Sequence, residues 1–349
     1  MRLTGRSTGL ARRLRRAAAV VLAVQFCLPT WGWNAHGHRI ITLLALDGLP
    51  ADAPAWLRDA SVRARIAYQS NEPDRWRGTR THPIGHENKP DHFLDVELLD
   101  QFGLTLETLP RFRYDYVQVM SVSKHVHPGK VDPYDAGKDS DHYKPFPGYL
   151  PHAMAEHFAK LVSSFNTVRV LEALNESART EQLAMARANA IYHMGLLSHF
   201  VGDAAQPLHT TRHFNGWDGA NPNGYTTSTR FHSEIDGGVL RHHRITYELM
   251  KPLVKYERKV KRGEVWDDLI AHIQRSFDKM EPLYQLEQSG ELEAEAGKEF
   301  IVERLADGAS MLSALFHAAY VESEPTKEQI AAFVRYNQRD ANEKLKGPQ

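Results

Sequence analysis

Residues 183–209, LAMARANAIYHMGLLSHFVGDAAQPLH, are the most informative segment of the chain about its fold. From Leu183 to Val201 the chain is nearly all apolar or small, which predicts a long buried helix. Pro207 ends such a helix, because proline has no amide hydrogen to donate, and it turns His209 back toward the helix end. The sequence therefore predicts a buried helix that carries polar side chains at its carboxyl end.

Helical periodicity recurs through the rest of the chain, whereas alternating strand patterns separated by turn dipeptides are hard to find. Further helices are expected at residues 40–46, 154–174, 265–280 and 300–320. Two long polar loops, 124–151 and 210–229, interrupt them, and loops of that length in a compact domain are more often functional than idle. We predict an all-α fold, a single domain of many helices over residues 33–338, followed by a polar tail at 339–349.

Composition excludes several classes of protein. The 349 residues include 43 Lys and Arg against 43 Asp and Glu, a balance that argues against a basic nucleic-acid-coating protein and an acidic disordered one. A single cysteine excludes a disulfide framework, a zinc ribbon and a cysteine-ligated iron–sulfur cluster. The 19 histidines are unusually many, and they become informative only through their spacing.

The first 32 residues are expected to be a signal peptide. They hold six arginines and no acid, and an apolar run from Ala17 to Pro29 follows, too short to span a membrane. Cleavage before Trp33 would leave a secreted or periplasmic protein without stable membrane insertion, exported by either the general or the twin-arginine route. The mature chain would keep 37 basic and 43 acidic residues and lose Cys27.

Histidine and aspartate recur at helical spacing. His199 and Asp203 are four residues apart and so project from one helix face, and a carboxylate in a buried stretch must be paired or bind a metal. His209 follows closely, and His232 and Asp236 repeat the spacing. One such pair is most often a surface hydrogen bond, but two pairs with His209 favour a metal site, and imidazole with carboxylate suits zinc. Further candidates are His38, Asp74, His92 and Asp95.

These residues fall in motifs of a known family. The motifs are W-x-x-x-G-H at 33–38, D-x-x-R at 74–77, H-F-x-D at 92–95, H-F-x-G-D-x-x-Q-P-L-H at 199–209 and H-x-x-x-D at 232–236. The chain resembles the single-strand-specific zinc nucleases of the S-one/P-one type, which share a fold with zinc-dependent phospholipase C. The resemblance runs from Trp33 to about Gly238, and the last hundred residues match only in helical pattern.

The resemblance implies a site with three zinc ions. The first would be held by Asp74, His92, His199 and Asp203. The second would be held by the free amine and carbonyl of Trp33, by His38 and by the bridging Asp203. The third would be held by His209, His232 and Asp236. Water activated between two zincs would attack phosphorus in line, with Asp74 orienting it or taking its proton and Arg77 holding phosphoryl oxygens.

The resemblance also implies a base-binding site at Phe93 and Asp95. Stacking accepts any unpaired base, which would give single-strand preference; the alternative is that Phe93 is a core aromatic beside a ligand. The expected activity is an endonuclease that acts on single-stranded RNA and DNA and leaves 5′-phosphorylated products, with 3′-nucleotidase activity as a further expectation. No obligate protein partner is expected.

Departures from the family pattern keep a phospholipase C, with phospholipid as substrate, as the alternative. The family's Asp-x-Gly-Gly-Asn segment is replaced by residues 213–221, in which His213 and Trp217 are expected to order the loop. The aromatics of the 124–151 loop would line a nucleobase or sugar subsite, or an apolar wall for acyl chains; they are Tyr134, Tyr143, Phe146 and Tyr149. Five histidines are expected to be loop or surface residues: His125, His127, His142, His152 and His157. A third possibility, a zinc-binding protein with a dead site, is disfavoured because every polar position is present.

Overall fold

The computed structural model describes residues 33–79 and 81–337, and its described part is all-α, without a β-strand. This confirms the fold class expected from the sequence. The expected signal peptide and polar tail, residues 1–32 and 339–349, lie outside the described residues. No helix in the described ranges is both long enough and apolar enough to cross a membrane.

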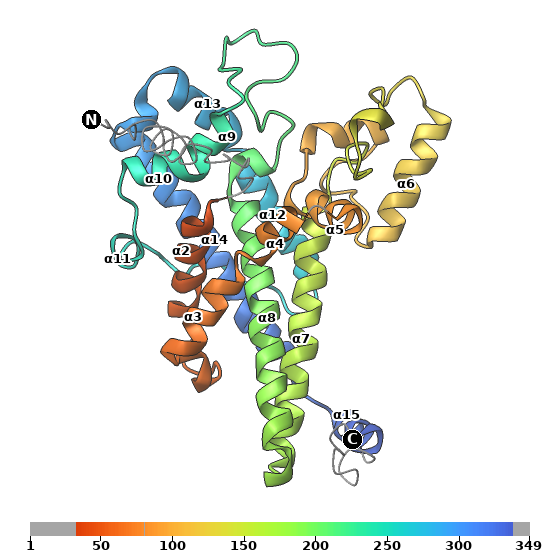
Figure 1. Cartoon of the computed structure of the whole chain (residues 1–349), viewed down its shortest axis with the longest axis vertical. Helices are drawn as coiled ribbons and strands as arrows, with labels where there is room; N and C mark the ends of the chain where they lie inside the picture. The colour runs from red at the N-terminus through yellow and green to blue at the C-terminus, as the bar shows by residue number, and fades with distance from the viewer. Residues whose placement is uncertain (1–32, 80, 338–349) are drawn as a thin grey trace, which may run out of the picture. The chain divides into compact units, whose positions relative to one another are not determined.

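Two long helices, α7 (Leu150–Leu174) and α8 (Thr180–Ala205), pack side by side at the centre of the fold (Figure 1). Asn175 ends α7 in the left-handed conformation, with φ +48°, and reverses the chain. Helix α8 is buried without interruption from Met194 to Ala205. Its outer half is only partly covered, by a small cluster around Val168 and Leu171 of α7, so the predicted burial holds for the inner half alone.

Helices from both ends of the chain cover this pair. Helix α14 (Glu295–Glu322) packs against α2 (Ala35–Asp47), α8 and α7, and α3 (Ala60–Gln69) packs against α8 and α2. The helix expected at 265–280 is α12 (Val265–Phe277), and a separate helix, α13 (Met280–Gln288), follows it. The helices thus enclose one main hydrophobic core that surrounds the inner half of α8.

Shorter elements connect these helices. The remaining α-helices are α4 (Glu72–Trp76), α5 (His82–Asn88), α6 (Arg113–Val126), α9 (Phe231–Ser233), α10 (Val239–His242), α11 (Tyr247–Met250) and α15 (Lys327–Tyr336). The 3-10 segments are η1 (Ala55–Arg58), η2 (Arg77–Thr79), η3 (Lys89–His92), η4 (Val96–Phe102), η5 (Ala136–Lys138), η6 (Ser177–Arg179), η7 (Pro207–His209) and η9 (Glu291–Glu293). A π-helical turn, η8, spans Glu234–Gly238.

The first predicted loop is shorter than expected, because α6 continues to Val126 and α7 begins at Leu150. Its last residues are held against the segment that contains Phe93. The amide of Asp95 donates to the carbonyl of Pro147 at 2.7 Å, and a Cβ on Gly148, whose φ is +110°, would lie 2.1 Å from the carbonyl oxygen of Phe93. Only glycine allows so close an approach, so the loop is fixed beside residues 90–95.

The expectation of loop or surface histidines was wrong for His152 and His157. Both lie on α7, which begins four residues earlier than its periodicity indicates, and both are buried. His152 stacks on Tyr116 at 5.0 Å between ring centroids, and His157 stacks on Phe200 at 5.3 Å. Their burial follows from their position on α7 faces that pack against neighbouring elements. His125, His127 and His142 are exposed, as expected.

Candidate metal centre

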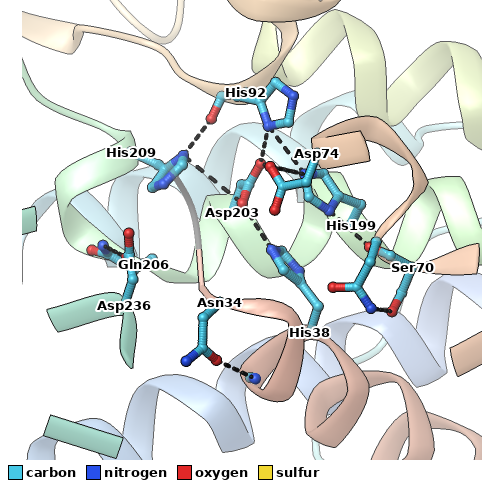
Figure 2. A network of polar contacts seen from close by, with 12 residues as sticks. Asn34, His38, Ser70, Asp74, His92, His199, Asp203, Gln206, His209 and Asp236 are labelled. Carbon is cyan, nitrogen blue, oxygen red and sulfur yellow. Dashed lines mark hydrogen bonds and ion pairs between the residues drawn. The ribbon is translucent and has the colours of Figure 1, made fainter. Parts of the chain in front are cut away.

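The end of α8 gathers three ligand-type side chains. His199 and Asp203 project from its last turns, and His92 comes from the end of η3 (Figure 2). Asp203 Oδ2 lies 2.9 Å from His92 Nδ1 and 3.3 Å from His199 Nε2, and these two ring nitrogens are 3.0 Å apart. One carboxylate oxygen and two imidazole nitrogens therefore converge on one point.

The other carboxylate oxygen of Asp203 faces helix α2. His38 Nε2 lies 3.3 Å from Asp203 Oδ1, and the His38 ring stacks on that of His199 at 4.1 Å. Gly202 makes room for His38, because a Cβ at Gly202 would lie 2.7 Å from His38 Nδ1. Asp203 thus bridges the side chains of α2 and those of η3 and α8, as the expected shared ligand requires.

A second group lies beside the first. His209 comes from η7, His232 from α9 and Asp236 from the π-helical turn. The Nε2 atoms of the two histidines are 3.1 Å apart, and His232 Nε2 is 3.3 Å from Asp236 Oδ2. Gln206 donates to Asp236 Oδ1 at 2.8 Å and fixes that carboxylate from the far side (Figure 2).

Backbone carbonyls orient two of the histidines. His199 Nδ1 lies 2.8 Å from the carbonyl oxygen of Ser70, and His209 Nδ1 lies 2.5 Å from the carbonyl oxygen of His92. Since a carbonyl only accepts, Nδ1 of each ring carries the proton and Nε2 keeps its lone pair, directed into the cluster. Metal-binding histidines are commonly held in this way by a partner for the other nitrogen.

Burial disfavours the charged form of these histidines. It lowers the pKa of His92 to about 4, and it lowers the pKa values of His199, His209 and His232 below their ordinary range. For Asp203 burial by itself would raise the pKa, but the surrounding histidines, His199 first, hold it well below its ordinary value. Neutral imidazoles around an ionised carboxylate are the protonation states that metal ligands require.

The residues therefore fit metal ions. Three groups have ligand atoms close enough to share an ion: His38 with Asp74 and His199; His92 with His199 and Asp203; and His209 with His232 and Asp236. All except Asp74 are buried. Within the described residues, His38 Nδ1 is buried without a hydrogen-bond partner, and His38 Nε2 and Asp203 Oδ1 are 3.3 Å apart without the geometry of a hydrogen bond. Buried polar atoms are normally satisfied, so these atoms suit a shared partner such as a metal ion.

Asp74 lies beside His199, one of the residues with which the resemblance groups it. Its Oδ1 is 3.8 Å from His199 Nε2, and His38 is the third member of their group. Asp74 also forms an ion pair with Arg77. Burial lowers the pKa of Arg77 to about 10, so the guanidinium remains charged at neutral pH. Asp74 therefore lies between the histidine cluster and the guanidinium of Arg77.

Trp33, the expected N-terminal ligand, is followed directly by a residue whose backbone contacts the second group. Trp33 is completely buried, just before α2, the helix that carries His38. The side chain of Asn34 caps α2, and the backbone amide of Asn34 donates to the carbonyl of Asp236 at 3.1 Å. The start of the described chain is thus joined to the π-helical turn of the second group.

A cavity of about 320 Å³ opens onto the cluster. Its lining includes three of the histidines, His92, His209 and His232, together with Phe93, Asp95, Tyr143, Lys144, Phe146, Leu208 and Phe214. Phe93 and Tyr143 meet edge to face at 6.4 Å. Asp95 is buried, which raises its pKa well above the ordinary value, and its Oδ1 has no hydrogen-bond partner among the described residues. Burial therefore favours the protonated form of Asp95, which can donate a hydrogen bond.

Sequence reasoning missed part of this wall. It did not select Phe214, Leu208 or Lys144, and it left Tyr143 and Phe146 without a definite place. The only sequence signal for Tyr143 and Phe146 was that they are aromatic residues in a loop rich in proline and glycine. The backbone contacts between the loop and residues 90–95 bring Tyr143 and Phe146 opposite Phe93.

Comparison of the sequence with known protein families finds no match, and comparison with curated proteins finds none. The described part of the chain is an all-α domain with buried His and Asp groups able to hold metal ions.

Proposed function

We propose that this protein is a secreted zinc-dependent phosphodiesterase that cleaves single-stranded RNA and DNA. One observation carries the proposal: His92, His209 and His232, members of the metal-capable groups, line the same cavity as Phe93, Tyr143, Phe146 and Phe214. A molecule bound in this cavity contacts the metal-binding histidines and the aromatic wall at the same time. A nucleotide, with its phosphate and flat base, has both complementary parts.

The donor set is nitrogen and oxygen without sulfur, which suits zinc. The three groups, with the freed amine of Trp33 joining His38, would hold three ions. Zinc bound there supplies Lewis-acid activation of water and positive charge for phosphoryl oxygens.

The chain's own residues supply the rest of the chemistry. The Asp74 carboxylate is partly exposed and lies at the edge of the cluster, where it accepts a proton from the attacking water. Arg77, charged at neutral pH, holds a phosphoryl oxygen through its planar N–H groups. Asp203 stays ionised and fixes the positions of His38, His92 and His199.

Selectivity for single strands follows from the cavity wall. A base inserted beside Phe93 and Tyr143 must leave its stack and its partner, which costs least in a single strand. Asp95, whose protonated form is favoured by burial, lies in the same wall and offers a hydrogen bond to the edge of that base. A duplex would have to be opened before either contact forms.

The proposal is tested with the chain cleaved before Trp33, supplied with single-stranded and duplex DNA of the same sequence. Cleavage of the single strand that stops on addition of a chelator and returns with zinc is expected, together with its loss in Asp203→Ala. The aromatic wall would also suit the quaternary ammonium of a choline headgroup, so lecithin is assayed in parallel. Release of phosphocholine without nucleotide release would replace the nuclease with the phospholipase C alternative.

A further inference from the structure

A second cavity lies next to the first and shares two lining residues with it. It measures about 600 Å³ and is formed mainly by the 127–149 loop, with η4 and the end of α6. Lys144 and Phe146 line both cavities. A ligand longer than one nucleotide that fills the first cavity therefore meets the second across these two side chains.

The second cavity contains ammonium groups without neutralising partners. Lys124 Nζ donates to the carbonyl of Pro145 at 3.1 Å, and Lys144 Nζ donates to the carbonyl of Lys138 at 2.7 Å. Neither forms an ion pair with a carboxylate in the part of the chain that the structure describes. Each ammonium has three N–H donors, so each keeps donors available for an anion.

The nearby carboxylates are already occupied. Asp132 accepts from the Gln101 amide at 2.8 Å, and Asp135 lies 3.3 Å from Lys138 Nζ and accepts from the amide of Gly137 at 3.0 Å. Asp135 thus caps η5 and pairs with Lys138, and Asp132 is hydrogen-bonded to Gln101 of η4. The lining thus holds three lysines against two aspartates, and Lys124 and Lys144 are the two lysines that no described carboxylate pairs.

The cavity also offers an aromatic face. Tyr134 lines it, and the residue is 43% exposed. Its hydroxyl donates to Asp139 Oδ2 at 3.2 Å, and the same carboxylate oxygen accepts from the Lys144 amide at 2.8 Å. The ring is thus held in place by the loop that carries Lys144, and little ordering cost remains for a base that stacks on it.

We propose that the second cavity binds the nucleotide adjacent to the one in the first cavity, with its base on the Tyr134 ring and its phosphodiester at Lys124 and Lys144. This inference rests on the proposed function. Stacking platforms next to cationic groups are the usual means of holding single strands without reading sequence. The site would accept any base and would make affinity increase with strand length.

The test compares a mononucleotide, thymidine 3′-monophosphate, which fills the first cavity only, with an octathymidylate. We measure the ratio of kcat/KM on the octamer to that on the mononucleotide in Tyr134→Ala, Tyr134→Phe and Lys124→Gln. The ratio is expected to fall about tenfold in Tyr134→Ala and in Lys124→Gln, through KM, and to stay within about twofold in Tyr134→Phe, which keeps the ring. Lys327→Gln on α15 is the charge-matched control, with an unchanged ratio. Equal effects on both substrates, or an unchanged ratio in Tyr134→Ala, would overturn the proposal.

A binding measurement separates this inference from the proposed function. Fluorescence anisotropy of labelled octathymidylate with chelator-treated protein reports binding without turnover. If the wild-type chain cleaves neither substrate, the proposed function fails, but weaker octamer binding by Tyr134→Ala than by Tyr134→Phe still supports the second site. Equal binding by these two variants overturns it, whatever the activity.

Discussion

Substitution of Gly202 by alanine tests the contact between α8 and α2 that places His38 beside Asp203. The new Cβ would lie 2.7 Å from His38 Nδ1 and 3.1 Å from its Cε1. Ordinary van der Waals contact begins near 3.4 Å, so the ring must shift by about 0.7 Å. The methyl group cannot yield, because it belongs to a buried helix.

The effect on folding stability is the difference of two terms. Overpacking a tight core costs about 1–3 kcal/mol, whereas replacing glycine by alanine within a helix gains about 1 kcal/mol. We therefore expect the free energy of unfolding of zinc-free protein to fall by only about 0–2 kcal/mol. The effect on metal binding is larger in relative terms, because ligand distances in zinc sites tolerate about 0.2 Å.

The assay is zinc content after equilibration in a zinc buffer, with urea denaturation of the chelator-treated protein as the measure of stability. Gly202→Ala should weaken binding at the His38 position about 10–100-fold, the cost of disturbing a ligand's support. Gly129→Ala is the matched control, because a Cβ there meets no atom within 4 Å. Zinc affinity equal to that of the wild type in Gly202→Ala would refute the reasoning that His38 is a ligand held by this contact.

Three further predictions follow from other parts of the molecule. Arg113 holds the buried Asp91 in a two-pronged ion pair at 2.7 and 3.3 Å. Arg113→Met should therefore lower the free energy of unfolding by about 2–4 kcal/mol in urea denaturation. A loss no greater than that of Glu156→Gln, which removes the other carboxylate paired with Arg113, would contradict this. Burial lowers the pKa of His157 to about 3. Between pH 6.5 and 3 the unfolded chain therefore binds a proton at this residue that the folded chain does not. The free energy of unfolding falls on acidification by up to about 1.4 kcal/mol per pH unit. His157→Gln should flatten this slope, and parallel urea-midpoint profiles from pH 6.5 to 4.5 would count against it. A chain that keeps residues 1–32 has an amide at Trp33 in place of an amine, so metal analysis should find it with one zinc fewer than the chain cleaved before Trp33, and equal zinc content would exclude the N-terminal ligand.

Local sequence patterns were sufficient for the fold class and for the pairing of several site residues. The apolar stretch before His199 and the four-residue interval to Asp203 place both side chains on one helix face wherever that helix packs. The break at Pro207 is a local property of the backbone, and α8 ends at Ala205, two residues before it. These features depend on neighbours in the chain and can be read without knowing the tertiary arrangement.

Periodicity was less reliable where an element is defined by what it packs against. His152 and His157 looked like solvent-facing residues in and near a polar loop, yet α7 begins at Leu150 and turns both into the protein. Likewise, α8 is buried only where other helices surround it, and Met185 in its outer half is 59% exposed. Burial is a property of the whole assembly of helices, and one segment's composition only limits it.

Local patterns were enough to predict an all-α chain with His199, Asp203, His209, His232 and Asp236 at ligand spacing, because helix geometry and proline chemistry act over a few residues. Which of these ligands meet depends on how the helices pack. The tertiary structure joined His38 and Asp74 to His199 and set the loop aromatics Tyr143 and Phe146 across from Phe93. These contacts join residues separated by about 50 to more than 100 positions in the chain, and they depend on the packing of α2, α4 and the 127–149 loop around α8, which no local pattern encodes.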